Sequence, residues 1–407
     1  MKRVVITGMG VVCPLGSNVE EYIKGLENNK SGIQKMEKWK EYIGLNTLVA
    51  APAKIENEKS IPRKKRRSMG RMGIFAAQAT EEAVKDSGLS ESVITSARTG
   101  CIIGSTMGGA EAMNDTFEIM LPEKDLSKLS SMNFFKCVSH TAAMNVSQCF
   151  GIKGYVMATS AACASALQAV GAAYGLIQSG KQDVVLCGGA EELHAIVAGS
   201  FDILFATSTH FNDNPECTPR PFDKDRDGLV CGEGSGILVL EDYEHAQKRN
   251  AKVYAEVSGY HTCGSGEHVS QSNKEAMVSC MKETLKSADM QPDNIDYINA
   301  HATATIHGDK QEAEALKEIF GDKIPVSSLK GYIGHTLGAS GSIELIAALK
   351  MMQKSKIYPT KNLNDVAEDC KGINHVMKIQ EKEINSILKN CFAFGGINAS
   401  LICKKIL

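Results

Sequence analysis

The chain has 407 residues, of which 43% are hydrophobic and 23% are charged, and its formal net charge is -2. This length allows two domains or one large layered core. The near-neutral balance gives no general attraction to nucleic acid or to an anionic membrane surface, and no run of 18 apolar residues predicts a membrane span. The 13 cysteines form no CxxC pair, which argues against a zinc site or a disulfide framework and favours a reducing, cytoplasmic location.

Strand-like and helical segments alternate along the chain, which predicts an α/β fold with largely buried strands. The first segment, 3–7, is interpreted as a buried strand rather than a signal peptide, because Gly8 and Gly10 break its apolar run. In chain order, further strands are expected at 100–104, 183–187, 236–240, 253–259, 297–300 and 388–392, and helices at 68–86, 165–179, 273–287, 310–319 and 342–353. The charged segment 241–252 is the expected seam between an N-terminal half, 1–245, and a C-terminal half, 246–407.

A weak internal repeat links the two halves. Cys163–Lys181 aligns with Gly338–Lys356 at an offset of 175, with six identities in 19 positions. Both segments are helical in pattern and rich in small residues, so they can pack closely against a sheet or against each other. The repeat predicts two similar halves around a pair of central helices, with shared composition as the alternative explanation.

Candidate chemistry gathers at the ends of these elements. Cys163 precedes an Ala-rich helix, where unpaired N–H groups and the helix dipole favour a thiolate and can hold an oxyanion. We therefore expect Cys163 to be the most reactive thiol. His301 ends a predicted strand, His335 precedes the second small-residue helix, and Phe394 flanks a Gly-Gly turn after the last strand. Each histidine alone is better explained as a core residue, but together they indicate an active site.

Taken together, these segments resemble a β-ketoacyl-[acyl-carrier-protein] synthase of the elongating kind, synthase II, within the thiolase superfamily. The resemblance covers nearly the whole chain and rests on RVVITGMGVVCPLG, SAACASA, RPFDKDRDGLVCGEGSGILVLEDYEHA, NAHATAT…GDKQEAE, KGYIGHTLGASG and FAFGGINAS. It implies a thiolase-like five-layered αβαβα fold made from two similar halves, and usually a homodimer.

The same resemblance implies an acyltransferase that condenses malonyl-carrier protein with an enzyme-bound acyl chain, releasing CO2 and giving a 3-oxoacyl chain in fatty acid elongation. Cys163 would carry the acyl chain, and His301 and His335 would stabilise the enolate. Backbone N–H groups of Cys163 and Phe394 would form the oxyanion hole. No metal and no cofactor is expected, because phosphopantetheine arrives on the carrier-protein substrate.

Other positions match supporting roles in the family. Lys330 and Glu312 match an ion pair that orients the histidines, with an ordinary structural salt bridge as the alternative. Thr303 and Thr305 match contacts to the phosphopantetheine arm. Met107 matches the floor of the acyl pocket, and Phe394 also matches a gate.

One basic run is the only concentrated charge in the sequence, and it matches the place where the family docks the carrier protein. It consists of Arg63, Lys64, Lys65, Arg66 and Arg67. A solvated helix start is the plainer interpretation, and nucleic acid binding is disfavoured because no aromatic residues interleave the charges.

The chain departs from the family pattern at Ala302, Ala304, Ala393 and Ile397. Ala393 replaces a glycine and is expected to stiffen the gating turn. These departures leave open a ketosynthase subunit of a type II polyketide or polyene pathway, paired with a chain-length-factor-like subunit in a heterodimer. A silent dimerisation partner is a further alternative, against which the joint presence of Cys163 and the two histidines argues. Acyl chain length, branching and unsaturation are not predicted by the sequence.

Overall fold

One mixed β-sheet runs through the computed structural model, which describes residues 1–271 and 273–406. Within these residues the sheet has 11 strands. In sheet order they are β12 (Asn374–His375), β10 (Pro325–Ser327), β9 (Tyr297–Asn299), β14 (Ser386–Ala393), β15 (Ile397–Lys404), β8 (Ala255–Gly264), β1 (Val4–Val12), β7 (Gly234–Asp242), β6 (Val184–Glu191), β4 (Thr99–Gly104) and β5 (Val156–Met157). Two short two-stranded sheets pair β2 (Gln34–Lys35) with β3 (Val49–Ala50) and β11 (Lys356–Ile357) with β13 (Gln380–Glu381).

The two ends of the large sheet have the same topology. In the N-terminal half the order is β5-β4-β6-β7-β1, and in the C-terminal half it is β10-β9-β14-β15-β8. Both runs begin with two parallel pairings and finish with two antiparallel ones. The halves join where β1 pairs with β8, Val4 opposite Val257. Two similar halves, as predicted from the internal repeat, are therefore confirmed.

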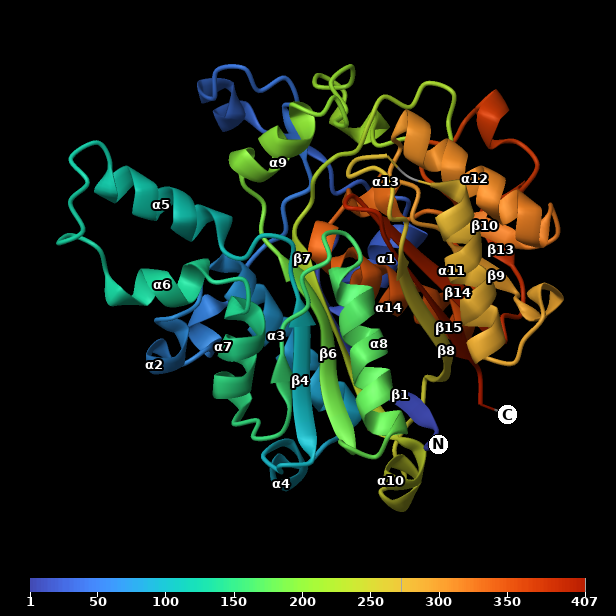
Figure 1. Cartoon of the computed structure of the whole chain (residues 1–407), viewed down its shortest axis with the longest axis horizontal. Helices are drawn as coiled ribbons and strands as arrows, with labels where there is room; N and C mark the ends of the chain where they lie inside the picture. Colours follow the sequence, from blue (N-terminus) through green and yellow to red (C-terminus); the bar gives the residue numbers. More distant parts are fainter. Residues whose placement is uncertain (272, 407) are drawn as a thin grey trace.

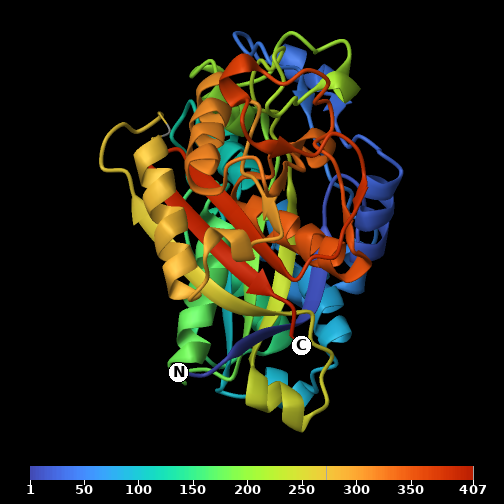
Figure 2. The ribbon, with the colours of Figure 1, turned by 90° about the vertical axis from the view of Figure 1, so that its right-hand side faces the viewer.

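Helices cover both faces of the sheet (Figure 1). Their bounds are α1 (Val19–Glu27), α2 (Arg63–Arg66), α3 (Arg71–Ser87), α4 (Glu91–Ile94), α5 (Ala110–Met120), α6 (Ser131–Cys137), α7 (Thr141–Phe150), α8 (Ser165–Gln178), α9 (Ala195–Asp202), α10 (Tyr243–Lys248), α11 (Lys274–Ser287), α12 (Ile306–Phe320), α13 (Lys330–Ile333) and α14 (Ser340–Lys354). Helices α3 and α7 pack on the outer face of the N-terminal strands, and α11 with α12 covers the C-terminal strands. Figure 2 turns the C-terminal strands β14 and β15, in red, toward the viewer.

The central layer consists of α8 and α14, which contact each other and strands of both halves. They begin at Ser165 and Ser340, at the predicted offset of 175, and are preceded by Ala164 and Ala339 as N-caps. Small residues allow their close approach: a Cβ at Gly341 would lie 2.9 Å from the backbone nitrogen of Leu167. The layers are therefore outer helices, N-terminal strands, the central pair α8 and α14, C-terminal strands and outer helices, which is the expected five-layered fold.

The predicted strands and helices are all present, with boundaries shifted by a few residues. Several elements were not predicted from the sequence, among them α1, α7, α9, β10 and β15. The arm formed by α5 and α6, which projects from the body in Figure 1, was not predicted either. The expected seam at 241–252 contains the short helix α10, and the domain boundary at 245/246 stays a prediction. No helix among the described residues is long and apolar enough to cross a membrane.

Candidate active site

The three predicted reactive side chains meet between the two halves. Cys163 lies two residues before α8, His301 follows β9, and His335 lies between α13 and α14. The Sγ of Cys163 is 2.8 Å from Nε2 of His335, and the two imidazole rings lie edge to face with centroids 5.2 Å apart. All three side chains are buried, with exposed fractions of 6% or less. The sequence prediction that these residues share one site is consistent with this geometry.

Backbone hydrogen bonds fix both histidines. The carboxylate of Glu312 accepts the N–H groups of His301 at 2.8 Å and Ala302 at 2.7 Å, which holds the turn after β9. The backbone N–H of His335 donates to the carbonyl of Val230 at 2.7 Å. The backbone at both positions is therefore held by the fold, whereas Nδ1 of each imidazole is buried without a hydrogen-bond partner.

Burial and nearby cations keep the histidines neutral. Desolvation lowers the pKa of His301 and His335 well below 6.5, and the ammonium groups of Lys330 and Lys389 lower it further. Burial also raises the pKa of the Cys163 thiol to about 12, although Lys330 opposes this. The expected resting thiolate is therefore contradicted, because desolvation outweighs the helix start. A neutral Cys163–His335 pair is the resting state.

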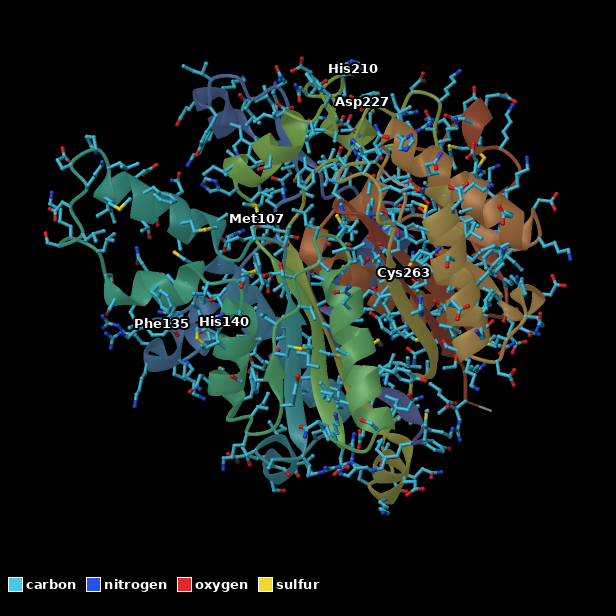
Figure 3. All side chains as sticks on the ribbon, in the orientation of Figure 1. Met107, Phe135, His140, His210, Asp227 and Cys263 are labelled. Atoms are coloured by element: carbon cyan, nitrogen blue, oxygen red, sulfur yellow. The ribbon has the colours of Figure 1, made fainter. Side chains whose placement is uncertain are left out.

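Another cysteine better fits the description of a readily ionised thiol. Cys263, labelled in Figure 3, is partly exposed on β8. Hydrogen bonding from Cys280 lowers the pKa of Cys263 to about 7. The lower pKa of Cys263 stands against the expectation that Cys163 is the most reactive thiol, which stays a prediction. Selective chemistry at Cys163 has to come from the bound substrate and from His335.

The predicted pairing of Lys330 with Glu312 is corrected by the structure. Lys330 instead donates to Glu344 on α14, with Nζ 2.6 Å from Oε1. The other carboxylate oxygen of Glu344 accepts from Lys389 on β14. Glu312 is occupied by the backbone of the turn after β9 and forms no ion pair with Lys330 within 4 Å.

Glu344 and Lys389, both of which are fully buried, were not among the residues predicted from the sequence. Each is a lone charge within an apolar stretch, SIELIAAL for Glu344 and SILKNCF for Lys389. A charged residue on an otherwise buried strand or helix is uncommon without a partner. That signal was available in the sequence, although the identity of the partner was not.

A cavity of about 270 Å³ opens onto the three reactive side chains. Its lining also includes Thr303, Thr305 and Phe394, and the two threonine hydroxyls are 3.1 Å apart. These three predicted substrate contacts therefore face the cavity. Met107, labelled in Figure 3, is not among the lining residues and packs instead in a cluster with Leu337. Its predicted place on the floor of the acyl pocket is not supported by this cavity.

Phe394 stands at the turn that connects β14 with β15. Gly395 and Gly396 follow it with φ of 87° and 70°, a conformation that favours glycine. The N–H of Gly395 donates to the carbonyl of Val269 at 2.6 Å, which ties the turn to the loop after β8. The Phe394 ring contacts Phe201, with centroids 5.8 Å apart. Stiffening of this turn by the alanine at position 393 stays a prediction.

The basic run forms the short helix α2 and its C-cap, beside α7 at one side of the molecule (Figure 1). Lys65 donates to the carbonyl of Cys149, and Arg66 donates to the carbonyl of Glu58. Arg63, Lys64 and Arg67 are exposed. None of the five lines the cavity.

Cys163, His301 and His335 are also the one group of three or more His, Cys, Asp or Glu residues, within the described part of the chain, that could hold a metal ion. Their possible ligand atoms all lie within 4.8 Å of one another. A thiol and two imidazoles suit a soft or borderline cation. The same three groups also suit nucleophilic catalysis with two N–H donors, so the predicted absence of a metal stays a prediction.

Comparisons with known proteins identify the family of the chain. Residues 1–246 match the model of the Beta-ketoacyl synthase, N-terminal domain, and residues 254–364 match the Beta-ketoacyl synthase, C-terminal domain. The chain belongs to the β-ketoacyl synthase family.

Individual relatives extend the likeness over the full length. A 3-oxoacyl-[acyl-carrier-protein] synthase 1 from Haemophilus influenzae is 38% identical over 100% of this chain and 99% of its own. The crystal structure of a β-ketoacyl synthase from Burkholderia phymatum superposes with a TM-score of 0.97 at 41% identity, covering all of both chains. A type II polyketide ketosynthase solved with its acyl-carrier protein gives a TM-score of 0.91 at 30% identity, also covering both chains completely.

Proposed function

We propose that this protein catalyses the decarboxylative condensation of malonyl-carrier protein with an acyl chain held on Cys163, giving a 3-oxoacyl-carrier protein. The observation that carries the proposal is the contact between Cys163 Sγ and His335 Nε2 at 2.8 Å, beside His301 in a substrate-sized cavity. Family membership supports the same reaction. Phosphopantetheine enters with the substrate, and the protein itself needs no cofactor.

The first half-reaction loads the enzyme. As the sulfur of Cys163 attacks the acyl thioester, Nε2 of His335 accepts the thiol proton, which it can do because the imidazole is neutral. A new S–acyl bond forms, the acyl–pantetheine bond breaks, and the departing thiolate takes the proton. Backbone N–H groups of Cys163 and Phe394 are the proposed donors to the tetrahedral oxyanion.

The second half-reaction makes the carbon–carbon bond. Loss of CO2 from the malonyl group leaves an enolate, and the electron pair of the broken bond becomes its nucleophile. For this step the neutral His335 carries its single proton on Nε2, the nitrogen that faces Cys163, after a change of tautomer from the loading step, in which Nε2 was the acceptor. The N–H groups of His301 and His335 then donate to the enolate oxygen, where charge develops. The enolate carbon attacks the acyl group, the C–S bond to Cys163 breaks, and the sulfur takes a proton from Nε2 of His335, which is replaced from water.

The pathway that supplies the acyl substrate and the numbered synthase class are also proposals. Fatty acid elongation is supported by the relative named synthase 1, and the numbered class, I or II, stays a prediction. A polyketide or polyene ketosynthase paired with a related subunit is the second candidate, supported by the 30% identical polyketide ketosynthase that was solved with its carrier protein. The carrier protein is the proposed partner in both cases.

Reconstituted condensation tests the proposal. The protein is mixed with acyl-carrier proteins of graded chain length and then with malonyl-carrier protein, and the products are identified by mass spectrometry. We expect one acyl mass on Cys163 and a product longer by two carbons. Acyl loading without product formation, or no loading at all, would contradict the assignment. The preferred primer length separates the two candidate pathways.

We propose a homodimer in which a second copy of this chain covers the exposed apolar side chains of the α5–α6 arm. Phe117, Leu126 and Phe134 have exposed fractions of 55%, 63% and 65%. Apolar groups gathered on one projecting arm are typical of a surface that another protein covers. A second copy of this chain is the proposed occupant, which the particle mass in solution would measure.

Carrier-protein docking is proposed at the basic run. Substitution of Lys64 and Arg67 by glutamate reverses two exposed charges and spares Lys65 and Arg66, which hold backbone carbonyls. We expect KM for acyl-carrier protein to rise about tenfold, because exposed charges act mainly on encounter and fall off with salt over about 8–10 Å. Kinetics with an acyl-pantetheine, which has no acidic surface, provide the control and should barely change. Equal losses with both substrates would show that the run supports the fold instead.

A further inference from the structure

A buried group of charges lies beneath the proposed active site. Glu344 on α14 lies between two ammonium groups: Lys330 donates to Oε1 and Lys389 donates to Oε2. All three side chains have exposed fractions of 0%. Glu312, which is also buried, brings the group to two lysines and two glutamates.

Lys389 occupies an unusual place for a cation. It lies in the middle of β14, paired with Leu401 on β15 and with Asn299 on β9. A lysine inside a sheet loses its hydration, and this loss is offset only by a well-placed counter-ion. Burial lowers the pKa of Lys389, but the carboxylate of Glu344 outweighs burial and raises the pKa overall. Lys389 is therefore charged in the folded protein.

This second cation is not needed to neutralise Glu344, because Lys330 already pairs with it at 2.6 Å. Lys389 supplies the second positive charge of the group once Glu312 is counted, so charge balance alone would explain a lysine in this buried strand. The charge of Lys389 does, however, affect the reactive centre. It lowers the pKa of both His301 and His335, in the same direction as Lys330.

We propose that Lys389 is a further positioning residue of the condensation site, where it fixes Glu344 and Lys330 from the strand side and adds a second positive charge beneath His301 and His335. This inference rests on the proposed function. Lys389 does not line the cavity and does not touch substrate. It acts through the neighbouring charges, and it keeps His335 able to accept the thiol proton.

The test is the pH dependence of Cys163 loading in Lys389→Met, an unbranched apolar replacement. Removing a positive charge makes protonation of the imidazoles easier, so the pH below which loading slows should rise by about one unit. Loading from an acyl-carrier protein is followed by intact mass between pH 5 and 8. A purely structural lysine would change the unfolding temperature, or all rates equally, without moving this pH. If Lys389→Met slows at the same pH as the wild type, the inference is overturned.

Matched variants keep the experiment decisive. Lys404→Met removes a lysine from the neighbouring strand β15, where Nζ is 3.8 Å from Glu256 and the side chain is partly exposed, and it should leave the pH profile unchanged. Lys389→Gln keeps a hydrogen-bond donor for Glu344 but removes the charge. It replaces Lys389→Met in the same test if the methionine variant does not fold. Lys389→Arg keeps the positive charge, so its loading should slow at the same pH as in the wild type. Wild-type protein that does not load or condense would contradict the proposed function. Normal wild-type activity, together with Lys389 variants that slow at the same pH as the wild type, would contradict only the role of Lys389.

Discussion

Replacing Cys163 by alanine is expected to abolish acyl loading and to lower condensation by about 10⁴-fold or more, because the covalent route is lost. Decarboxylation of malonyl-carrier protein should persist, since the two histidines that stabilise the enolate remain. Intact-mass spectrometry measures loading, and CO2 release measures decarboxylation in the absence of a primer.

Cys263→Ala is the matched control for this variant. Cys263 is partly exposed, and its pKa is lowered to about 7 by hydrogen bonding from Cys280, so it is the thiol that competes with Cys163 for the assignment. It lies on β8 and is not among the cavity-lining residues. The control should therefore load an acyl chain at the wild-type rate. An acyl mass retained in Cys163→Ala and lost in Cys263→Ala would refute the assignment of the nucleophile.

The architecture was predictable because its signals are local and periodic. Buried strands such as β4 and β6 appear as short apolar runs, and the similarity between α8 and α14 is visible as a repeat in small residues. Strand β15 was missed because INASLICK mixes polar and apolar residues, and its burial depends on neighbours from both β14 and β8.

The site was predictable in its residues but not in its electrostatics. Motifs identified Cys163, His301 and His335, and the structure brings them together. The ionisation state of Cys163 was predicted wrongly, because the N-terminal position before α8 is visible in a sequence but the depth of burial is not. The partner of Lys330 was also wrong, since Glu344 lies 14 residues away on another helix and Glu312 was chosen by its match to the family motif.

Alanine at either histidine is expected to lower condensation by about 10²–10³-fold, the usual cost of losing one oxyanion donor. The two variants should differ in the loading step. His335 contacts the Cys163 sulfur, so His335→Ala should also slow acylation. His301→Ala should load Cys163 at nearly the wild-type rate and then stall with malonyl-carrier protein. Separate single-turnover measurements of loading and decarboxylation resolve these steps.

The pH dependence of acyl loading tests whether His335 is neutral in the resting enzyme. Both histidine pKa values are lowered well below 6.5, so both imidazoles are neutral at pH 6.5 and above, and protonation removes the base at His335 only at lower pH. Wild-type loading should therefore stay constant from pH 8 down through pH 6.5. His210→Ala, at a side chain that is 80% exposed near Asp227 (Figure 3), controls for loss of any histidine and should leave both steps unchanged. Loading that falls with a midpoint near pH 6.5 would mean that His335 is accessible to water, and the neutral Cys163–His335 pair would then not be the resting state.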